Sequence, residues 1–304
     1  MAVKSARRVT RVSASPSALA SQRARELKAQ GEDVVALSSG EPDFQPPAHV
    51  IQAAHEAMLA GQTKYTTMSG TAELKEAIIA KFKRENNLQY AANEVMVSAG
   101  AKQVIFNALM ATVEQGCEVI IPAPFWIAYE QIVQLAGGTP RVVTCGAETG
   151  FKLDAEALAR HITPATRWLV LNSPSNPSGA VYTRAELRAL ADVLLKHPQI
   201  WVLTDDIYEH IIFDGREAAT IAAVEPALKD RTITVNGVSK TYAMTGFRIG
   251  FCGGPAAMMS EMLKMQSQST SGPSSVGQAA AVAALTGPQD ILRERSDAFQ
   301  ERRD

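Results

Sequence analysis

Lys240 and Arg248 lie eight residues apart, and their side chains offer two complementary kinds of chemistry. The β-branched run 232–235 before them predicts a buried strand, and burial lowers the pKa of a lysine amine enough to make it nucleophilic. Such an amine forms a Schiff base with an aldehyde, and an arginine can hold a phosphate through two hydrogen bonds. Pyridoxal phosphate (PLP) carries both groups. Taken alone, however, a Ser-Lys pair is more often part of a surface loop.

Small or polar residues also follow three other predicted strands. The run 95–97 precedes SAGAK (98–102), 168–171 precedes NSPSNP (172–177), and 201–204 precedes DDIY (205–208). Parallel sheets covered by helices bind ligands beyond the C-terminal ends of their strands, so these segments are expected to meet. A small-residue turn that opens a helix also presents backbone N–H groups to a phosphate. Each segment alone is ordinary turn sequence, but together they indicate a cofactor site.

The elements that must position these residues form an alternating pattern. We expect strands at 34–37, 95–97, 118–121, 140–143, 168–171, 201–204 and 232–235. We expect helices at 17–30, 47–59, 71–86, 102–113, 125–135, 154–161, 183–195 and 290–304, with the arginines of the last facing solvent. Thr183 and Glu186 match a capping box. The alternation predicts an α/β fold in which a mainly parallel sheet is sandwiched by helices.

Composition excludes several classes of function. The formal net charge of −1 gives no field that would attract nucleic acid or an anionic membrane. No apolar run approaches the ~18 residues that a membrane span needs. Three widely spaced cysteines indicate neither disulfides nor a metal site and favour a cytoplasmic location. The five histidines have no ligand spacing, so no metal is expected.

Residues 1–25 are basic and rich in serine, and they contain no acid. This composition is similar to that of an organelle transit peptide. We prefer a basic structural arm that leads into the helix 17–30, because helix-forming residues continue as far as Gly31.

Five motifs together resemble those of the class I and II aminotransferases, which are PLP-dependent enzymes of fold type I. The motifs are SGEPDF (39–44), KYT (64–66), NSPSNPSG (172–179), DDIYE (205–209) and SKTYAMTGFR (239–248). Within the family, the sequence most resembles the bacterial aspartate aminotransferases. The resemblance implies a ping-pong transfer of an amino group between an amino acid, with aspartate or glutamate favoured, and a 2-oxo acid.

The resemblance also implies a role for each site residue. Lys240 would hold PLP as a Schiff base and move a proton, Asp205 would pair with the ring nitrogen, and Tyr208 would bind the phenolate oxygen; these are the expected catalytic residues. The further cofactor-binding residues would be Gly100, Ala101, Lys102, Trp126, Asn176, Ser239 and Arg248, and Tyr65 from the second subunit of a homodimer. The substrate-binding residues would be Gly40, Lys102, Trp126 and Asn176, with Ser17 near the same pocket.

Lys102 has two interpretations. In the family, the matching lysine lies near the side-chain carboxylate of an acidic substrate. The alternative, which we disfavour, is that Lys102 is a solvated residue in the first turn of a helix. A lysine in the first turn is repelled by the positive end of the helix dipole, so an anionic partner should compensate its charge.

Two domains are implied. Residues 1–46 would form an arm and part of a small domain, 47–286 the large PLP-binding domain, and 287–304 the start of a truncated small domain. Family members continue past the position of residue 304 and bind the substrate α-carboxylate there with an arginine. We therefore expect weak or no transamination, and reduced solubility, from this chain.

Other functions remain open. The chain could be an aminotransferase of aromatic, alanine or prephenate specificity, or an inactive fragment with a PLP fold. A PLP-binding transcription regulator needs a DNA-binding domain, for which there is no room before residue 39. A nicotinamide dehydrogenase and a serine hydrolase are disfavoured because the G-x-G-x-x-G and G-x-S-x-G turns are missing.

Overall fold

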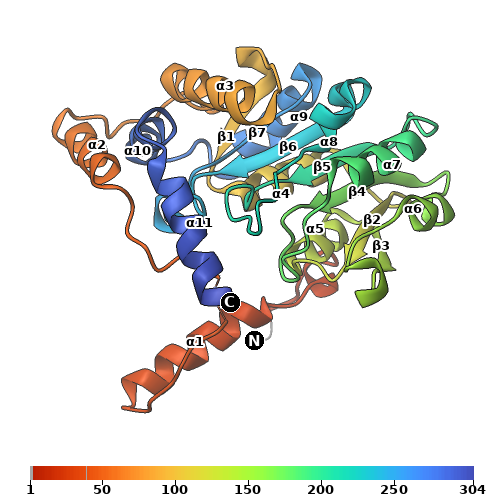
Figure 1. Ribbon diagram of the computed structural model, residues 1–304, viewed down its shortest axis with the longest axis horizontal. Coiled ribbons are helices and arrows are strands. Elements are labelled where there is room, and N and C mark those ends of the chain that lie inside the picture. Colours follow the sequence, from red (N-terminus) through yellow and green to blue (C-terminus); the bar gives the residue numbers. More distant parts are fainter. Residues whose placement is uncertain (1–2, 39) are drawn as a thin grey trace.

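The computed structural model describes residues 3–38 and 40–304, and its centre is a seven-stranded sheet (Figure 1). The strands are β1 (Val95–Ser98), β2 (Glu118–Ala123), β3 (Thr139–Thr144), β4 (Thr166–Asn172), β5 (Trp201–Asp205), β6 (Thr232–Gly237) and β7 (Gly250–Gly253). Their order is β1-β7-β6-β5-β4-β2-β3. β7 is antiparallel to both neighbours, and all other neighbouring pairs are parallel. The expected mainly parallel sheet is confirmed.

Eleven α-helices are described, and Figure 1 shows α1 projecting from the body at its lower edge. They are α1 (Pro16–Ala29), α2 (Ala48–Leu59), α3 (Ala72–Asn86), α4 (Ala101–Thr112), α5 (Ala128–Ala136), α6 (Ala155–His161), α7 (Arg184–Leu194), α8 (Ile221–Val224), α9 (Ala256–Ser267), α10 (Ser275–Thr286) and α11 (Asp290–Arg303). Five short 3-10 helices join them: Val9–Arg11, Ala92–Glu94, Ala147–Thr149, Pro226–Arg231 and Thr245–Phe247. Among the described residues, no helix is long and apolar enough to cross a membrane.

Both faces of the sheet are apolar because successive strand residues point to opposite sides. In β4, Trp168 and Val170 pack under α4, α5 and α9, whereas Leu169 and Leu171 pack under α6, α7 and α8. Helices α3 and α10 cover this second face beside β1 and β7, and α2 packs on α10. The two layers of helices hold the strand ends in fixed relative positions.

The local sequence explains several helix starts. The hydroxyl of Thr183 accepts the Glu186 N–H at 3.2 Å, and the Glu186 carboxylate accepts the Thr183 N–H at 2.7 Å, which confirms the capping box. Thr71 and Asp154 cap α3 and α6 in the same way with one bond each.

The structure differs from the sequence predictions in several elements, and helices α9 and α10 were not predicted. Residues 34–37 form no strand, and Val35 and Leu37 are 81% and 93% exposed; a strand needs a pairing partner, and no described strand lies beside them. The strand β7 was not predicted, because Gly250 and Gly253 weaken its pattern. Helix α5 begins at Ala128, three residues later than expected.

The arginines of α11 do not all face solvent. Arg302 pairs with Asp43 at 2.8 Å and Arg303 pairs with Asp214 at 2.8 Å, while Arg295 donates to the carbonyl of Gln45. Arg293, at 90% exposure, fits the expectation. Arg302 and Arg303 are exposed as expected, although both pair with segments distant in sequence, and the expectation was wrong only for the half-buried Arg295. The domain boundaries at residues 46 and 286 remain a prediction.

Candidate functional site

A cleft of about 1240 Å³ opens where β4, β5 and β6 end. Most of the predicted site residues line it: Gly40, Ala101, Lys102, Trp126, Asn176, Asp205, Tyr208, Ser239, Lys240 and Arg248. Gly100 lies directly behind this lining, and Tyr65 lies outside it. Segments up to 200 residues apart along the chain thus meet, as the strand-end rule predicts.

Lys240 lies just past β6 and is partly buried. Its Nζ donates to the Gly40 carbonyl and lies 5.8 Å from the centre of the Tyr208 ring. Burial lowers the pKa of this amine, with a contribution from Arg248, although the carboxylates of Glu41 and Asp205 oppose the shift. The amine therefore loses its proton more readily than an ordinary lysine, as a nucleophile requires.

Asp205 ends β5 and is only 4% exposed. Its Oδ2 accepts a hydrogen bond from the Tyr129 hydroxyl at 2.6 Å, and its Oδ1 accepts the Ile207 N–H at 3.4 Å. Burial raises the pKa of Asp205 to about 6, although these bonds and the charge of Lys240 oppose the rise. A buried carboxylate at a cleft wall, held by neutral donors, is suited to pair with a cationic ligand atom.

The loops after β4 and β5 are tied together. Asn172 donates through Nδ2 to the Asp205 carbonyl at 2.7 Å and accepts the Asn176 N–H through Oδ1 at 2.7 Å. Burial, followed by the charge of Asp205, raises the pKa of Tyr208 to about 12, against a hydrogen bond from Asn176. The Tyr208 phenol therefore stays protonated near neutral pH and can donate to an oxygen anion.

Gly100 and Arg248 form an anion-binding corner. Gly100 precedes α4 with φ 91°, and a Cβ there would collide with the Arg248 guanidinium. Arg248 is held by the carbonyls of Thr245 (3.0 Å) and Ala99 (3.4 Å). The N-terminus of α4 carries no side-chain cap, so the guanidinium and free helix N–H groups converge where a phosphate could bind.

Lys102 and Trp126 form a separate part of the cleft wall. The Lys102 Nζ lies 4.7 Å from the centre of the Trp126 ring, and that ring meets Tyr129 edge-on at 5.4 Å. Burial, and then Arg248, lower the pKa of Lys102, and no carboxylate in the described part of the chain offsets these effects. Ser17 lines the same cleft. An anionic ligand would supply a negative charge beside the Lys102 ammonium and offset the lowering of its pKa.

Two predicted residues stand apart. Tyr65 is 98% exposed and contacts neither the cleft nor the core. Ser39, which opens the SGEPDF motif, lies outside the described residues, whereas Gly40 of the same motif reaches Lys240.

Sequence reasoning missed Tyr129 and the effect of Glu41 on Lys240. Tyr129 follows Trp126 by three residues, a spacing that places two side chains on the same side of a helical turn. This spacing could have identified Tyr129 as a neighbour of the expected stacking residue.

The residues match PLP in their chemistry. Lys240 offers an amine for an aldehyde, Asp205 a carboxylate for a ring nitrogen, and Tyr208 a phenol for a ring oxygen. Because Gly100 has no Cβ, the Arg248 guanidinium can lie against the start of α4, and its donors together with the helix N–H groups suit a phosphate. The donor set fits this cofactor.

Comparison with known proteins gives consistent matches. A sequence model of the family described as "Aminotransferase class I and II" matches residues 32–304. An aspartate aminotransferase of Rhizobium meliloti is 57% identical over 281 residues, 92% of this chain and 68% of that protein. An aspartate/prephenate aminotransferase of Cereibacter sphaeroides is 53% identical over 296 residues, 97% of this chain and 74% of that protein. The crystal structure of a Rhizobium meliloti aspartate aminotransferase matches with a TM-score of 0.96 at 53% identity, covering 100% of this chain and 76% of that one.

Proposed function

This chain belongs to the class I and II aminotransferase family, and we propose that it moves the amino group of aspartate or glutamate to a 2-oxo acid with bound PLP. The observation that carries the proposal is the half-buried amine of Lys240 opposite Tyr208, between the buried Asp205 carboxylate and the anion-binding corner at Arg248.

When bound, PLP supplies an aldehyde that condenses with amines and a ring that accepts electrons from a substrate carbon. The chain's own residues hold and prepare this chemistry. Arg248 and the N-terminus of α4 bind the phosphate dianion. The Asp205 carboxylate would hold a proton on the ring nitrogen, and the Tyr208 phenol would donate a hydrogen bond to the ring oxygen.

Lys240 has two tasks in this proposal. Its Nζ, with a lowered pKa, would hold the cofactor through the aldehyde. When free, the same Nζ would accept the proton of the substrate α-carbon and hold it for return. Trp126 would cover one face of the ring and exclude water from it.

Lys102 supports the choice of an acidic substrate. Its ammonium lies on the cleft wall beside Trp126 with no carboxylate offsetting its lowered pKa. The second carboxylate of aspartate, glutamate or 2-oxoglutarate would offset it, and an uncharged amino acid such as alanine would not. Gly40, Trp126 and Asn176 are proposed as further substrate contacts.

Prephenate is a second candidate acceptor. The observation that favours it is the 53% identity to a relative named aspartate/prephenate aminotransferase. Prephenate also carries a carboxylate besides that of its 2-oxo acid group, so Lys102 could bind either acceptor.

The proposal includes a homodimer. Tyr65 is almost fully exposed, and in a dimer its phenol would reach the phosphate of the partner's cofactor. A cytoplasmic location, expected from the cysteines, remains a prediction.

Absorbance and borohydride trapping test the proposal. The purified protein with PLP should show a visible band that borohydride abolishes, with the label mapped to Lys240; Lys240→Ala should lose both. Aspartate should change the band, and 2-oxoglutarate or prephenate should restore it. A label at another lysine, or a band unaffected by Lys240→Ala, would refute the proposed role of Lys240.

A further inference from the structure

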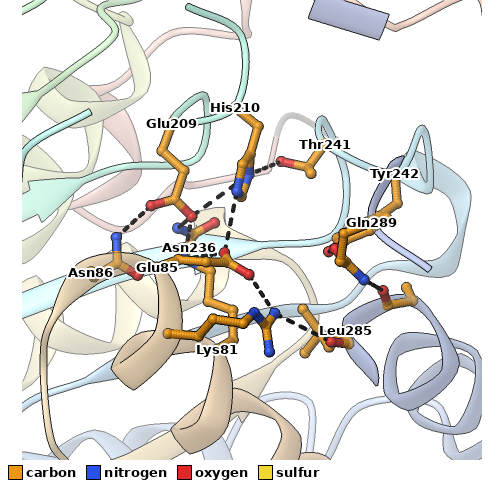
Figure 2. Close-up of polar contacts among 12 residues, drawn as sticks. Lys81, Glu85, Asn86, Glu209, His210, Asn236, Thr241, Tyr242, Leu285 and Gln289 are labelled. Atoms are coloured by element: carbon orange, nitrogen blue, oxygen red, sulfur yellow. Dashed lines mark hydrogen bonds and ion pairs between the residues drawn. The ribbon is translucent and has the colours of Figure 1, made fainter. Parts of the chain in front are cut away.

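A cluster of charged and polar side chains is buried behind the cleft, between α3 and the ends of β5 and β6 (Figure 2). Lys81, Glu209 and Asn236 are 2%, 6% and 1% exposed. None of these three lines the cleft. Burying an ion pair is unfavourable unless its hydrogen bonds are satisfied, and the desolvation penalty can exceed the attraction. A role in stability alone therefore explains this cluster poorly.

Glu209 is at the centre of the cluster. Its Oε1 accepts hydrogen bonds from Lys81 and, at 2.7 Å, from Asn236, while its Oε2 accepts one from Asn86 at 2.5 Å. Burial favours the neutral acid, but the charges of Lys81 and His210 and the hydrogen bonds outweigh it and lower the pKa of Glu209. Glu209 is therefore a carboxylate anion inside the protein.

The cluster joins the two segments that carry Tyr208 and Lys240. Glu209 directly follows Tyr208, so one short segment points one side chain into the cleft and the next into the cluster. Asn236 lies in β6, four residues before Lys240. A second link lies beyond Lys240, where the His210 Nδ1 is 3.3 Å from the Thr241 hydroxyl (Figure 2).

A metal ion is a poorer explanation of the cluster. Among the described residues, Glu85, Glu209 and His210 bring three ligand atoms together. The Lys81 ammonium already lies among them, bonded to Glu209 and 3.4 Å from Glu85 Oε2. The Lys81 ammonium therefore supplies the positive charge that a metal ion would otherwise provide.

We propose that Glu209 is a positioning residue that fixes Lys240 relative to Tyr208, through Asn236 on one side and through His210 and Thr241 on the other. This inference rests on the proposed function of Lys240. Displacement of a reacting group by about 1 Å can lower a rate about a hundredfold, so a rigid link between the two segments matters to the chemistry.

The charges around Glu209 come from two elements. Lys81 and Glu85 lie near the carboxylate on α3, Arg84 pairs with Glu85, and Asp206 and His210 lie beside the carboxylate on its own segment. The variants described below leave all of these charged groups in place. A change in the pH dependence of Lys240 labelling would therefore report a change in the position of Lys240.

Asn236→Ala and Asn86→Ala form a matched pair. Each removes one amide hydrogen bond to the same carboxylate and one bond accepted by the amide oxygen, from Lys81 at Asn86 and from the Gly237 N–H at Asn236. Only Asn236 belongs to the strand that leads to Lys240. The PLP dissociation constant should rise about tenfold for Asn236→Ala, the equivalent of one hydrogen bond, and less than about twofold for Asn86→Ala. Thr241→Val, which loses the second link, should act in the same direction as Asn236→Ala.

A second readout needs no cofactor. Labelling of Lys240 by trinitrobenzenesulfonate, followed across pH by peptide mapping, reports when its amine loses a proton. If Lys240 becomes less rigidly held and better solvated, its pKa rises toward the ordinary lysine value. The pH midpoint of labelling should therefore rise by about half a pH unit or more in Asn236→Ala and remain unchanged in Asn86→Ala.

The outcomes separate the two proposals. If both asparagine variants behave alike in PLP affinity and in labelling, the positioning role of Glu209 is wrong. If the unaltered protein fails to attach PLP at Lys240, the proposed function is wrong, and the labelling comparison still decides the positioning role. Glu209→Gln would leave Lys81 unpaired and risk misfolding, so the asparagine pair carries the test.

Discussion

The hydroxyl of Tyr129 donates a 2.6 Å hydrogen bond to Oδ2 of Asp205, and both side chains are nearly inaccessible, at 2% and 4% exposure. The bond comes from the first turns of α5 and reaches the last residue of β5. It orients a carboxylate that would otherwise have only one weak backbone donor. Tyr129 therefore favours the charged form of Asp205, against the burial that raises the pKa of this carboxyl.

Tyr129→Phe should raise the pKa of Asp205 further above its value of about 6, because the bond that favours the charged form is lost. A protonated Asp205 cannot pair with a protonated ring nitrogen. PLP affinity should fall about tenfold or more, since a hydrogen bond to a charged group contributes roughly 1.5–3 kcal/mol. The loss should be greatest between pH 6 and 7.5. Absorbance titration with PLP measures it. Tyr90→Phe is the control, because Tyr90 is another buried phenol and is hydrogen-bonded to Thr234. Equal effects of the two variants would contradict the role assigned to the Tyr129–Asp205 bond.

Gly100→Ala should weaken PLP binding about a hundredfold, because the new methyl group displaces the Arg248 guanidinium and one charge-assisted contact with the phosphate is lost. Pyridoxal, which lacks the phosphate, should bind about equally to both proteins. Gly116→Ala, at φ 96° but with open space around its Cβ, controls for backbone strain. An equal loss for pyridoxal and PLP would show that Gly100 does not serve the phosphate.

Lys102→Ala should raise KM for aspartate by about tenfold or more while leaving that for alanine within about twofold, because only aspartate has a second carboxylate to pair with the ammonium. Lys102→Arg keeps the charge and should restore part of the difference. Steady-state kinetics with both donors measures it. An equal change for the two donors would mean that Lys102 is a solvated helix residue.

Tyr65 and Lys240 allow a mixing experiment. If Tyr65 completes the partner's site, Tyr65→Phe and Lys240→Ala chains should together form a mixed dimer with one intact site. Tight PLP binding should then reappear at about one site per mixed dimer. Titration of the mixture against each variant alone measures it, and no recovery in a demonstrated mixed dimer would place the function of Tyr65 elsewhere.

Asp206 makes stability depend on pH. Burial raises its pKa from 3.8 to about 7, so the folded protein keeps a proton that the unfolded chain releases between these values. This group therefore lowers stability as pH rises through that window. Asp206→Asn lacks the titration, and its stability relative to the unaltered protein should improve by roughly 2–4 kcal/mol from pH 4 to pH 8. Urea unfolding at both pH values measures the difference, and a constant difference would contradict it.

The sequence predicted the parts of the fold that its local pattern determines. The central strands are β-branched or apolar runs such as 232–235, which only a buried sheet accommodates, and Thr183 with Glu186 marks a helix start. The run 34–37 has the same pattern but is exposed, since pairing depends on distant residues. β7 is short and bounded by glycines, so its local pattern is weak.

The placement of Asp205 and Lys240 on the cleft wall was predictable from the strand-end rule. Tyr129 was not, because its contact crosses 76 residues of chain. The partners of Arg302 and Arg303 were likewise hidden, since Asp43 and Asp214 lie in loops without regular periodicity. Charge and helical spacing reveal which residues an element exposes, but not which loop folds against it.

The contacts that hold the end of α11 make its docking sensitive to ionic strength. Arg302–Asp43 and Arg303–Asp214 are well exposed to solvent, and dissolved salt screens such pairs over a Debye length of about 8 Å at 0.15 M. The apolar sheet beneath the cleft has no comparable dependence. Concentrated salt should therefore weaken the docking of the end of α11 more than the packing of the sheet. The mobility of the loop that carries Gly40 and Asp43 should depend on ionic strength, whereas that of Asp205 should not.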